Sequence, residues 1–158
     1  MADEGRNAEI EIWKQRLSEE QNLPQDWREG IYQGIVKRLK GEHPGLKSLP
    51  TDLVMKLMFR ESRFDPTAKG SAGEIGLMQV KPDVAEEVMR RRGFGATENL
   101  ADPRENILAG MGYLQSLSKT LGGIGPAVEA YNVGPEAYKK GKRNPNYARA
   151  VLSRGMGQ

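Results

Sequence analysis

The stretch that most constrains the fold covers residues 102–123 and reads DPRENILAGMGYLQSLSKTLGG. Asp102 is a residue type that begins helices, Pro103 suits the first helical position, and Glu105 stands three residues after the cap. Apolar side chains then recur at helical spacing until two glycines end the run. These apolar positions are Ile107, Met111, Leu114, Leu117 and Leu121. The pattern predicts one long, buried helix at the centre of the protein.

Helical spacing also recurs on both sides of this stretch, whereas Val, Ile and Thr never form the alternating runs of a sheet. We therefore expect an all-α domain with at most a very small sheet. The first two helices should form a hairpin, and a Gly/Pro-rich linker should follow at 41–50. The predicted helices cover residues 8–19, 24–41, 50–61, 82–93, 103–121, 126–131 and the stretch after 145. Predicted inward-facing residues are Trp27, Ile31, Ile35 and Leu39 in the second helix, and Tyr147, Val151 and Leu152 in the last.

Composition narrows the classes of function. The chain has 158 residues, no cysteine, one histidine and a net charge of +3. A disulfide framework and a multi-histidine metal site are therefore excluded, and we predict no cofactor and no metal. No apolar stretch approaches the roughly 20 residues of a membrane span, and the acidic N-terminus does not resemble a signal peptide. There is no glycine-rich nucleotide motif, and the basic runs 90–92 and 139–143 do not alternate with aromatics, so we expect no nucleic-acid partner.

Those two basic runs have two possible meanings. Charge runs of this kind are usually solvated surface, and His43, in the linker, is also expected at the surface. Alternatively, either run could help to hold an acidic glycan or a wall that carries teichoic acid.

Glu61 is the strongest candidate for chemistry. It follows Leu57 and Met58 at helical spacing, so it should lie on or beside the buried face in the last turn of its helix. An acid at that position opposes the helix dipole, and a Pro/Gly-rich loop, typical of a cleft wall, follows at 65–74. Burial raises the pKa of a carboxyl group, which suits a general acid that later acts as a base. The ordinary alternative is a helix-end carboxylate paired with a neighbouring arginine.

Four other positions have both a functional and an ordinary interpretation. Ser62 has no nearby base, so it is expected to form a supporting hydrogen bond rather than to act as a nucleophile. Gln79 can donate and accept, as a sugar N-acetyl or hydroxyl group requires, although it could be an ordinary loop amide. Met78 should be core or cleft wall. Asn132, after Tyr131, could simply end a helix.

Five short motifs occur in a fixed order between Leu49 and Leu152. They are ES-x-F-x-P-x-A at 61–68, GLMQ-x-x-P at 76–82, DP-x-x-N-I-x-x-G-x-x-Y-L at 102–114, AYN-x-GP at 130–135 and Y-x-x-x-VL at 147–152. The set resembles the soluble lytic transglycosylase family, the peptidoglycan-cleaving branch of the α+β lysozyme-like superfamily. The resemblance implies a compact helical lysozyme-like domain. We expect a catalytic domain at 47–158 and an N-terminal helical extension at 1–46.

The resemblance also assigns roles to residues. Glu61 corresponds to the single catalytic acid/base of the family, and Ser62 to its hydrogen-bonded neighbour, which also reaches substrate. Met78 and Gln79 correspond to cleft residues. Tyr131 and Asn132 correspond to residues that line the cleft and contact an N-acetyl group. Tyr147 corresponds to a tyrosine that approaches the catalytic carboxyl. Asn106 and Ile107 correspond to residues with a structural role.

This chain departs from the family pattern at two named positions. Asp65 replaces the usual asparagine of the first motif, and Arg143 stands where the family often has an acid four residues before the late tyrosine. The segment before that tyrosine also lacks its usual aromatic residue. These differences concern the rim of the cleft rather than its catalytic centre.

The resemblance implies cleavage of the bond between N-acetylmuramic acid and N-acetylglucosamine, with Glu61 acting first as acid and then as base and a 1,6-anhydromuramic end as product. Two alternatives stay open. The first is a hydrolytic muramidase on the same fold, for which Asp65 and Glu74 are the nearby loop acids. The second is a structural or ejection component of a virion, or a component of a secretion apparatus, that binds wall without cutting it.

The expected site of action is the cell wall, in the periplasm, yet no export signal is visible. We consider three routes: carriage in a phage particle, which we favour, release through a membrane lesion, or membership of a larger protein. The expected partners are peptidoglycan strands and, with phage carriage or secretion, proteins of the virion or of a secretion apparatus.

Overall fold

A computed structural model describes residues 8, 11–12, 15–16 and 25–153. In this part of the chain the regular elements are helices, and extended pairing is limited to isolated bridges at Lys69–Ile75 and Ile75–Val80. The prediction of an all-α domain with at most a very small sheet is therefore confirmed. The elements are α2 (Gln25–Glu42), the short 3₁₀ helix η1 (Pro44–Leu46), α3 (Thr51–Ser62), α4 (Pro82–Arg92), α5 (Pro103–Leu121), α6 (Ile124–Val133), α7 (Pro135–Lys139) and α8 (Pro145–Leu152).

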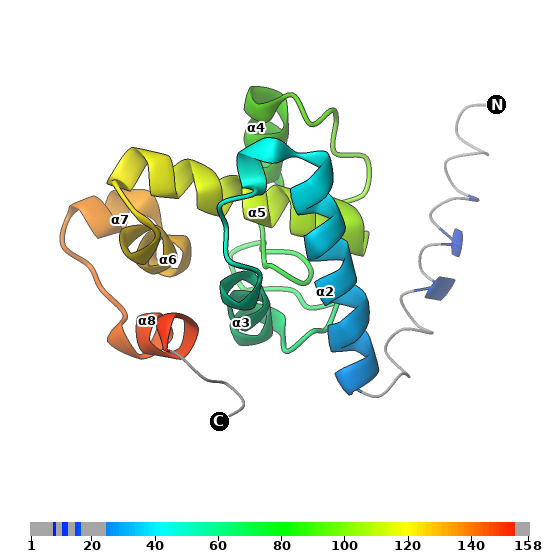
Figure 1. Cartoon of the computed structure of the whole chain (residues 1–158), viewed down its shortest axis with the longest axis horizontal. Coiled ribbons are helices and arrows are strands. Elements are labelled where there is room, and N and C mark those ends of the chain that lie inside the picture. The colour runs from blue at the N-terminus through cyan, green and yellow to red at the C-terminus, as the bar shows by residue number, and fades with distance from the viewer. Residues whose placement is uncertain (1–7, 9–10, 13–14, 17–24, 154–158) are drawn as a thin grey trace.

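Helix α5 is the central element, as its sequence predicts. It packs against α2, α4 and α6, and in Figure 1 it runs across the molecule from the side of α6 and α7 to α2. All residues from Asn106 to Gly112 are buried. Two glycines permit this close packing. A Cβ atom at Gly110 would lie 2.5 Å from the sulfur of Met78, and one at Gly112 would lie 2.7 Å from Val88.

The predicted buried face of α2 is wrong at Trp27 and Ile31, whereas Leu39 is buried as expected and Ile35 is partly buried against the core. Trp27 is 65% exposed and Ile31 is 42% exposed, whereas Tyr32, Val36 and Leu39 are fully buried. A strict four-residue spacing advances about 40° further than one helical turn, so the series from Trp27 drifts around the helix. The observed face combines spacings of four and three residues, which follow the 3.6-residue turn.

Other differences concern element ends. The linker after α2 contains η1 and buries Leu46 and Leu49, and α7 forms where the sequence predicts no helix. In α8, Tyr147 and Val151 are buried as expected, but Leu152 is 39% exposed because the helix ends there. The expected helix at 8–19 and the turn of its hairpin lie mostly outside the described residues.

One hydrophobic core joins most of the helices. The buried side chains of α2 belong to the same cluster as those of α3, α5, α6 and α8. The boundary predicted at residue 46 stays a prediction, but α2 shares its core with the expected catalytic domain. None of the described helices has both the length and the apolar character needed to span a membrane.

Candidate active site

Glu61 lies in the last turn of α3, at the wall of a cavity of about 540 Å³. The helix ends directly after it because Arg63 and Phe64 adopt left-handed backbone angles, with φ of +54° and +63°. This turn sends the chain into the loop 65–80, which forms another wall of the same cavity. The carboxyl group therefore stands where a rigid helix meets an irregular loop.

Burial gives the carboxyl group of Glu61 an unusually high pKa. Burial is the main cause that raises its pKa to about 7, and the negative charge of Glu74 adds to the rise. A hydrogen bond from Tyr147 and the positive charge of Arg60 act in the opposite direction. The Tyr147 hydroxyl donates to Oε1 of Glu61 at 2.6 Å. A carboxyl group with this pKa can both give and take a proton near neutral pH.

Asn106, which is fully buried in α5, forms hydrogen bonds to the loop that carries Met78 and Gln79. The side-chain oxygen of Asn106 accepts from the backbone N–H of Met78 at 2.8 Å. Its side-chain amide nitrogen donates to the backbone carbonyl oxygens of Ile75 at 2.8 Å and Leu100 at 2.9 Å. These bonds fix the loop against the central helix. The structural role expected for Asn106 is consistent with them.

Gln79 adopts a left-handed conformation, with φ of +49°. Its amide nitrogen donates to the carbonyl oxygens of Ala68 at 3.0 Å and Gly76 at 2.9 Å. Both N–H groups are therefore engaged within the protein. The side chain can therefore only accept a hydrogen bond from a ligand through its oxygen, whereas the sequence suggests that it both donates and accepts.

Tyr131 forms a buried part of the cavity wall. Its hydroxyl donates to the carbonyl oxygen of Met78 at 2.6 Å, and its ring packs against Tyr113 with 5.3 Å between centroids. Because the hydroxyl is bound to the loop, Tyr131 fixes the position of Met78 and offers mainly its ring to the cavity. The motif AYN and the motif GLMQ are thus in direct contact.

The structure places the predicted site residues in two groups. Glu61, Gln79, Tyr131 and Asn132 line the cavity. Ser62, Met78 and Tyr147 are buried behind it, and the Ser62 hydroxyl donates to the Met58 carbonyl oxygen at 3.1 Å.

Asn132 connects α6 to the start of α8. Its side-chain oxygen accepts from the amide of Asn144 at 2.9 Å, and the oxygen of Asn144 accepts from the backbone N–H of Tyr147 at 3.2 Å. Asn144 therefore caps α8 and joins it to the cavity wall. This chain of contacts determines where Tyr147 meets Glu61.

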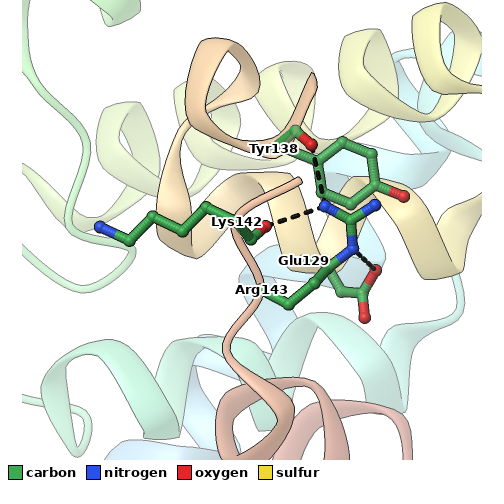
Figure 2. A network of polar contacts seen from close by, with 4 residues as sticks. All are labelled: Glu129, Tyr138, Lys142 and Arg143. Carbon is green, nitrogen blue, oxygen red and sulfur yellow. Dashed lines mark hydrogen bonds and ion pairs between the residues drawn. The ribbon is translucent and has the colours of Figure 1, made fainter. Parts of the chain in front are cut away.

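Arg143 stabilises the connection between α7 and α8 (Figure 2). Its guanidinium donates to the carbonyl oxygens of Tyr138 at 2.8 Å and Lys142 at 2.9 Å, and lies 3.7 Å from the Tyr138 ring centroid. It also forms an ion pair with Glu129 of α6, at 3.7 Å. Arg143, noticed in the sequence only as a departure from the family, thus fixes the turn that precedes Asn144.

Sequence reasoning missed part of the cavity wall. Helix α4 contributes Val84, Glu87, Val88 and Arg91, which share one helical face, and α5 contributes Tyr113 and Ser116. The three- and four-residue spacing in α4 was visible in the sequence, but spacing alone does not distinguish a cleft face from a core face. Glu74 also lines the cavity, whereas Asp65 accepts from Thr67 in its own turn.

Known proteins resemble this chain over more than half of its length. The family described as Transglycosylase SLT domain matches residues 43–151. The chain is 32% identical over 93 residues to the soluble lytic murein transglycosylase of Escherichia coli K12, which covers 56% of this chain and 14% of that protein. It is 40% identical over 97 residues to the membrane-bound lytic murein transglycosylase C of Haemophilus influenzae, covering 54% of this chain and 27% of that protein.

Solved structures show the same fold. An inactive mutant of lytic transglycosylase Slt from Pseudomonas aeruginosa superimposes with a TM-score of 0.60 at 25% identity, over 75% of this chain and 20% of that one. The 70-kDa soluble lytic transglycosylase of Escherichia coli gives 0.59 at 23% identity, over 77% and 21%. The chain thus spans about a seventh to a quarter of the length of these relatives. Because the family match covers more than half of its residues, this chain belongs to the transglycosylase SLT domain family.

Proposed function

We propose that this protein is a lytic transglycosylase that cleaves the glycan strands of peptidoglycan, with Glu61 as its single acid/base. The observation that carries the proposal is a carboxyl group with a pKa of about 7 at the wall of a cavity, held by the hydroxyl of Tyr147. Relatives whose names specify lytic murein transglycosylases support the substrate class.

The proposed reaction has two proton transfers. Protonated Glu61 donates to the oxygen of the bond between N-acetylmuramic acid and N-acetylglucosamine, and that bond breaks as positive charge develops at the anomeric carbon. The Glu61 carboxylate then removes the proton of the muramic 6-hydroxyl, whose oxygen attacks the anomeric carbon. A 1,6-anhydro ring forms, the carboxyl group returns to its protonated form, and no water is consumed.

The neighbouring groups have supporting roles in this proposal. The Tyr147 hydroxyl holds the carboxyl group and stabilises its charged form between the two steps. The side-chain oxygen of Gln79 and the exposed Asn132 position the acetamido group of the sugar, and the ring of Tyr131 packs along it. Ser62 and Met78 act from behind the cavity wall as supporting residues.

Product analysis tests the proposal. Purified cell-wall sacculi are incubated with the protein, and the released muropeptides are weighed by mass spectrometry. We expect anhydro ends in the wild-type digest and a loss of activity of at least about 10²-fold in Glu61→Gln, because general acid–base assistance is worth that much. Glu86→Gln, which removes a carboxylate outside this cavity, should retain activity. Undiminished activity of Glu61→Gln would contradict the assignment.

Glu74 is the observation that favours a second candidate, a hydrolytic muramidase. Its carboxylate lines the same cavity as Glu61, and a second carboxylate can activate water. Products of hydrolysis are heavier than anhydro products by one water. Reducing ends in the wild-type digest that disappear in Glu74→Gln would support hydrolysis, whereas anhydro ends in both proteins would support the transglycosylase reaction.

We also propose that a phage particle carries the protein to the wall. Immunodetection in purified particles would support it. Detection only in the periplasm of uninfected cells would contradict it.

A further inference from the structure

A second cavity of about 560 Å³ adjoins the candidate active site, and we call it the basic cavity. It lies between η1, the last turn of α4 with the segment after it, and the last turns of α5. Arg91 and Ser116 line both this cavity and the one that contains Glu61. A molecule bound beside Glu61 can therefore extend a substituent past these two residues into the basic cavity.

The charge of the basic cavity has one sign. Its lining includes Arg91, Arg92, Lys119 and His43 but no carboxylate. Arg91 is already paired with Glu87, at 2.8 Å. Among the described residues, neither Arg92 nor Lys119 forms an ion pair. Two permanent positive charges are thus left for an anion from outside the protein.

Arg92 is held in place by neutral groups. Its Nε donates to the Ser116 hydroxyl at 3.1 Å, and its guanidinium lies 6.0 Å from the ring centroid of Phe94. Phe94 in turn packs against His43, with 4.5 Å between ring centroids. Half-buried guanidinium groups usually face a carboxylate or phosphate, because neutral partners offset only part of the cost of burial. An anionic ligand would supply the missing charge, and it would find a donor that is already oriented.

We propose that the basic cavity binds a carboxylate of the peptide attached to a muramic acid residue in the bound glycan strand. This inference rests on the proposed function, because it takes the ligand from the same substrate. Continuity with the active-site cavity favours a substituent of the bound strand over a separate ligand. A planar carboxylate also matches the two-pronged donor geometry of arginine.

The test compares two substrates and two variants. Glycan strands with intact peptides and strands from which an amidase has removed the peptides are digested by wild type, Lys119→Gln and the double variant Arg92→Gln/Lys119→Gln. We expect kcat/KM on peptide-bearing strands to fall about tenfold in the double variant, and less in the single one. On stripped strands all three proteins should have equal kcat/KM.

A charge-matched control is Lys140→Gln/Lys142→Gln, which removes two exposed lysines that line neither cavity. It should behave as wild type on both substrates. Equal losses on stripped and peptide-bearing strands, or no loss on either, would overturn the proposal. Stripped strands that carry wall teichoic acid form a third arm, and a loss confined to them would assign the cavity to phosphate and also overturn it.

Binding separates this inference from the proposed reaction. Glu61→Gln protein is titrated calorimetrically with the free stem peptide, which is the peptide normally attached to muramic acid. This measurement needs no turnover. Binding that is lost on adding Arg92→Gln/Lys119→Gln would support the basic cavity, even if wild type cleaved no strand. No heat of binding with either protein, together with cleavage that does not depend on the peptide, would reject the basic cavity and leave the proposed function intact. Thermal melting of each variant establishes that it is folded.

Discussion

At the scale of single residues, the acidity of Glu61 depends on neighbours that act in opposite directions. The charge of Glu74 raises its pKa, and the hydrogen bond from Tyr147 lowers it. Because Glu61 must be protonated to act as an acid, its pKa determines the alkaline limb of the pH–activity profile. The two neighbours can be removed separately, which gives a paired prediction.

We expect Glu74→Gln to move the alkaline limb of kcat/KM to lower pH, because loss of a nearby negative charge makes Glu61 easier to ionise. Tyr147→Phe should move it to higher pH, because the charged form loses its donor. Initial rates measured between about pH 5 and 9 locate the alkaline limb in each variant and in the wild type. Shifts of the same sign in the two variants would show that Glu61 does not control this limb.

Burial of Glu61 also makes stability depend on pH. Below its ordinary pKa of 4.5 the carboxyl group is protonated whether folded or unfolded, so it costs nothing. As pH rises toward 7, the unfolded chain releases the proton while the folded chain retains it, and the folded state loses up to about 3 kcal/mol. Above pH 7 the cost stays constant.

Glu61→Gln should therefore unfold at a higher urea concentration than wild type at pH 8, and the two midpoints should converge near pH 4. Gln retains the oxygen that accepts from Tyr147, so the comparison isolates the charge. Urea titrations at the two pH values provide the measurement. A stability difference that does not change between them would mean that the carboxyl group is not buried as described.

At the scale of elements, the contact between α5 and the loop 75–80 determines the shape of the site. Asn106 bonds to the loop, and Gly110 lets the helix approach Met78 closely. A methyl group at Gly110 would lie 2.5 Å from the Met78 sulfur and 2.7 Å from its Cβ. The loop can move away from such a group only by giving up the bonds to Asn106.

Two glycine-to-alanine changes in helices should therefore have opposite effects. Gly110→Ala should destabilise the protein by about 1–3 kcal/mol through overpacking. Gly34→Ala in α2, where nothing lies within 4 Å, should stabilise it by up to about 1 kcal/mol, because alanine favours helix. Thermal denaturation of both variants checks the signs. Stabilisation by both changes would show that α5 and the loop are not in close contact.

Local sequence explains some of these elements and not others. Helix α5 was predictable because its start, its apolar spacing and its final glycines all agree. Helix α7 was not, because a helix of five residues that begins at the proline of a Gly-Pro pair is too short to show periodicity. The family motifs led to Glu61 and Tyr147, but no local pattern indicates that Glu74 lines the cavity or that the donors of Gln79 are already engaged. Those facts depend on contacts between distant segments of the chain.

At the scale of the whole molecule, α2 belongs to the core although the family match begins at residue 43. Leu39 is fully buried, whereas Ile31 on the same helix is 42% exposed. If the core is a single cooperative unit, a defect in α2 should weaken the site as well. The same contrast tests which face of α2 is buried.

Leu39→Ala should destabilise the protein by about 2–5 kcal/mol, and Ile31→Ala by well under 1 kcal/mol. Cleavage activity and far-UV circular dichroism should report a single unfolding transition in both variants. Separate transitions in Leu39→Ala, with activity lost only in the second, would mean that α2 is an independent extension, as the boundary at residue 46 predicts.

The hydrogen bond from Tyr147 to Glu61 joins residues 86 positions apart in the chain. Ribosomes make proteins from the N-terminus, so Glu61 is synthesised long before its donor. A growing chain can form α3 and even α5 while the carboxyl group still lacks α8. The candidate site is therefore completed only after α8 has been made. A product cut short before Pro145 would contain every residue of the first four motifs, but Glu61 would lack its hydrogen-bond donor.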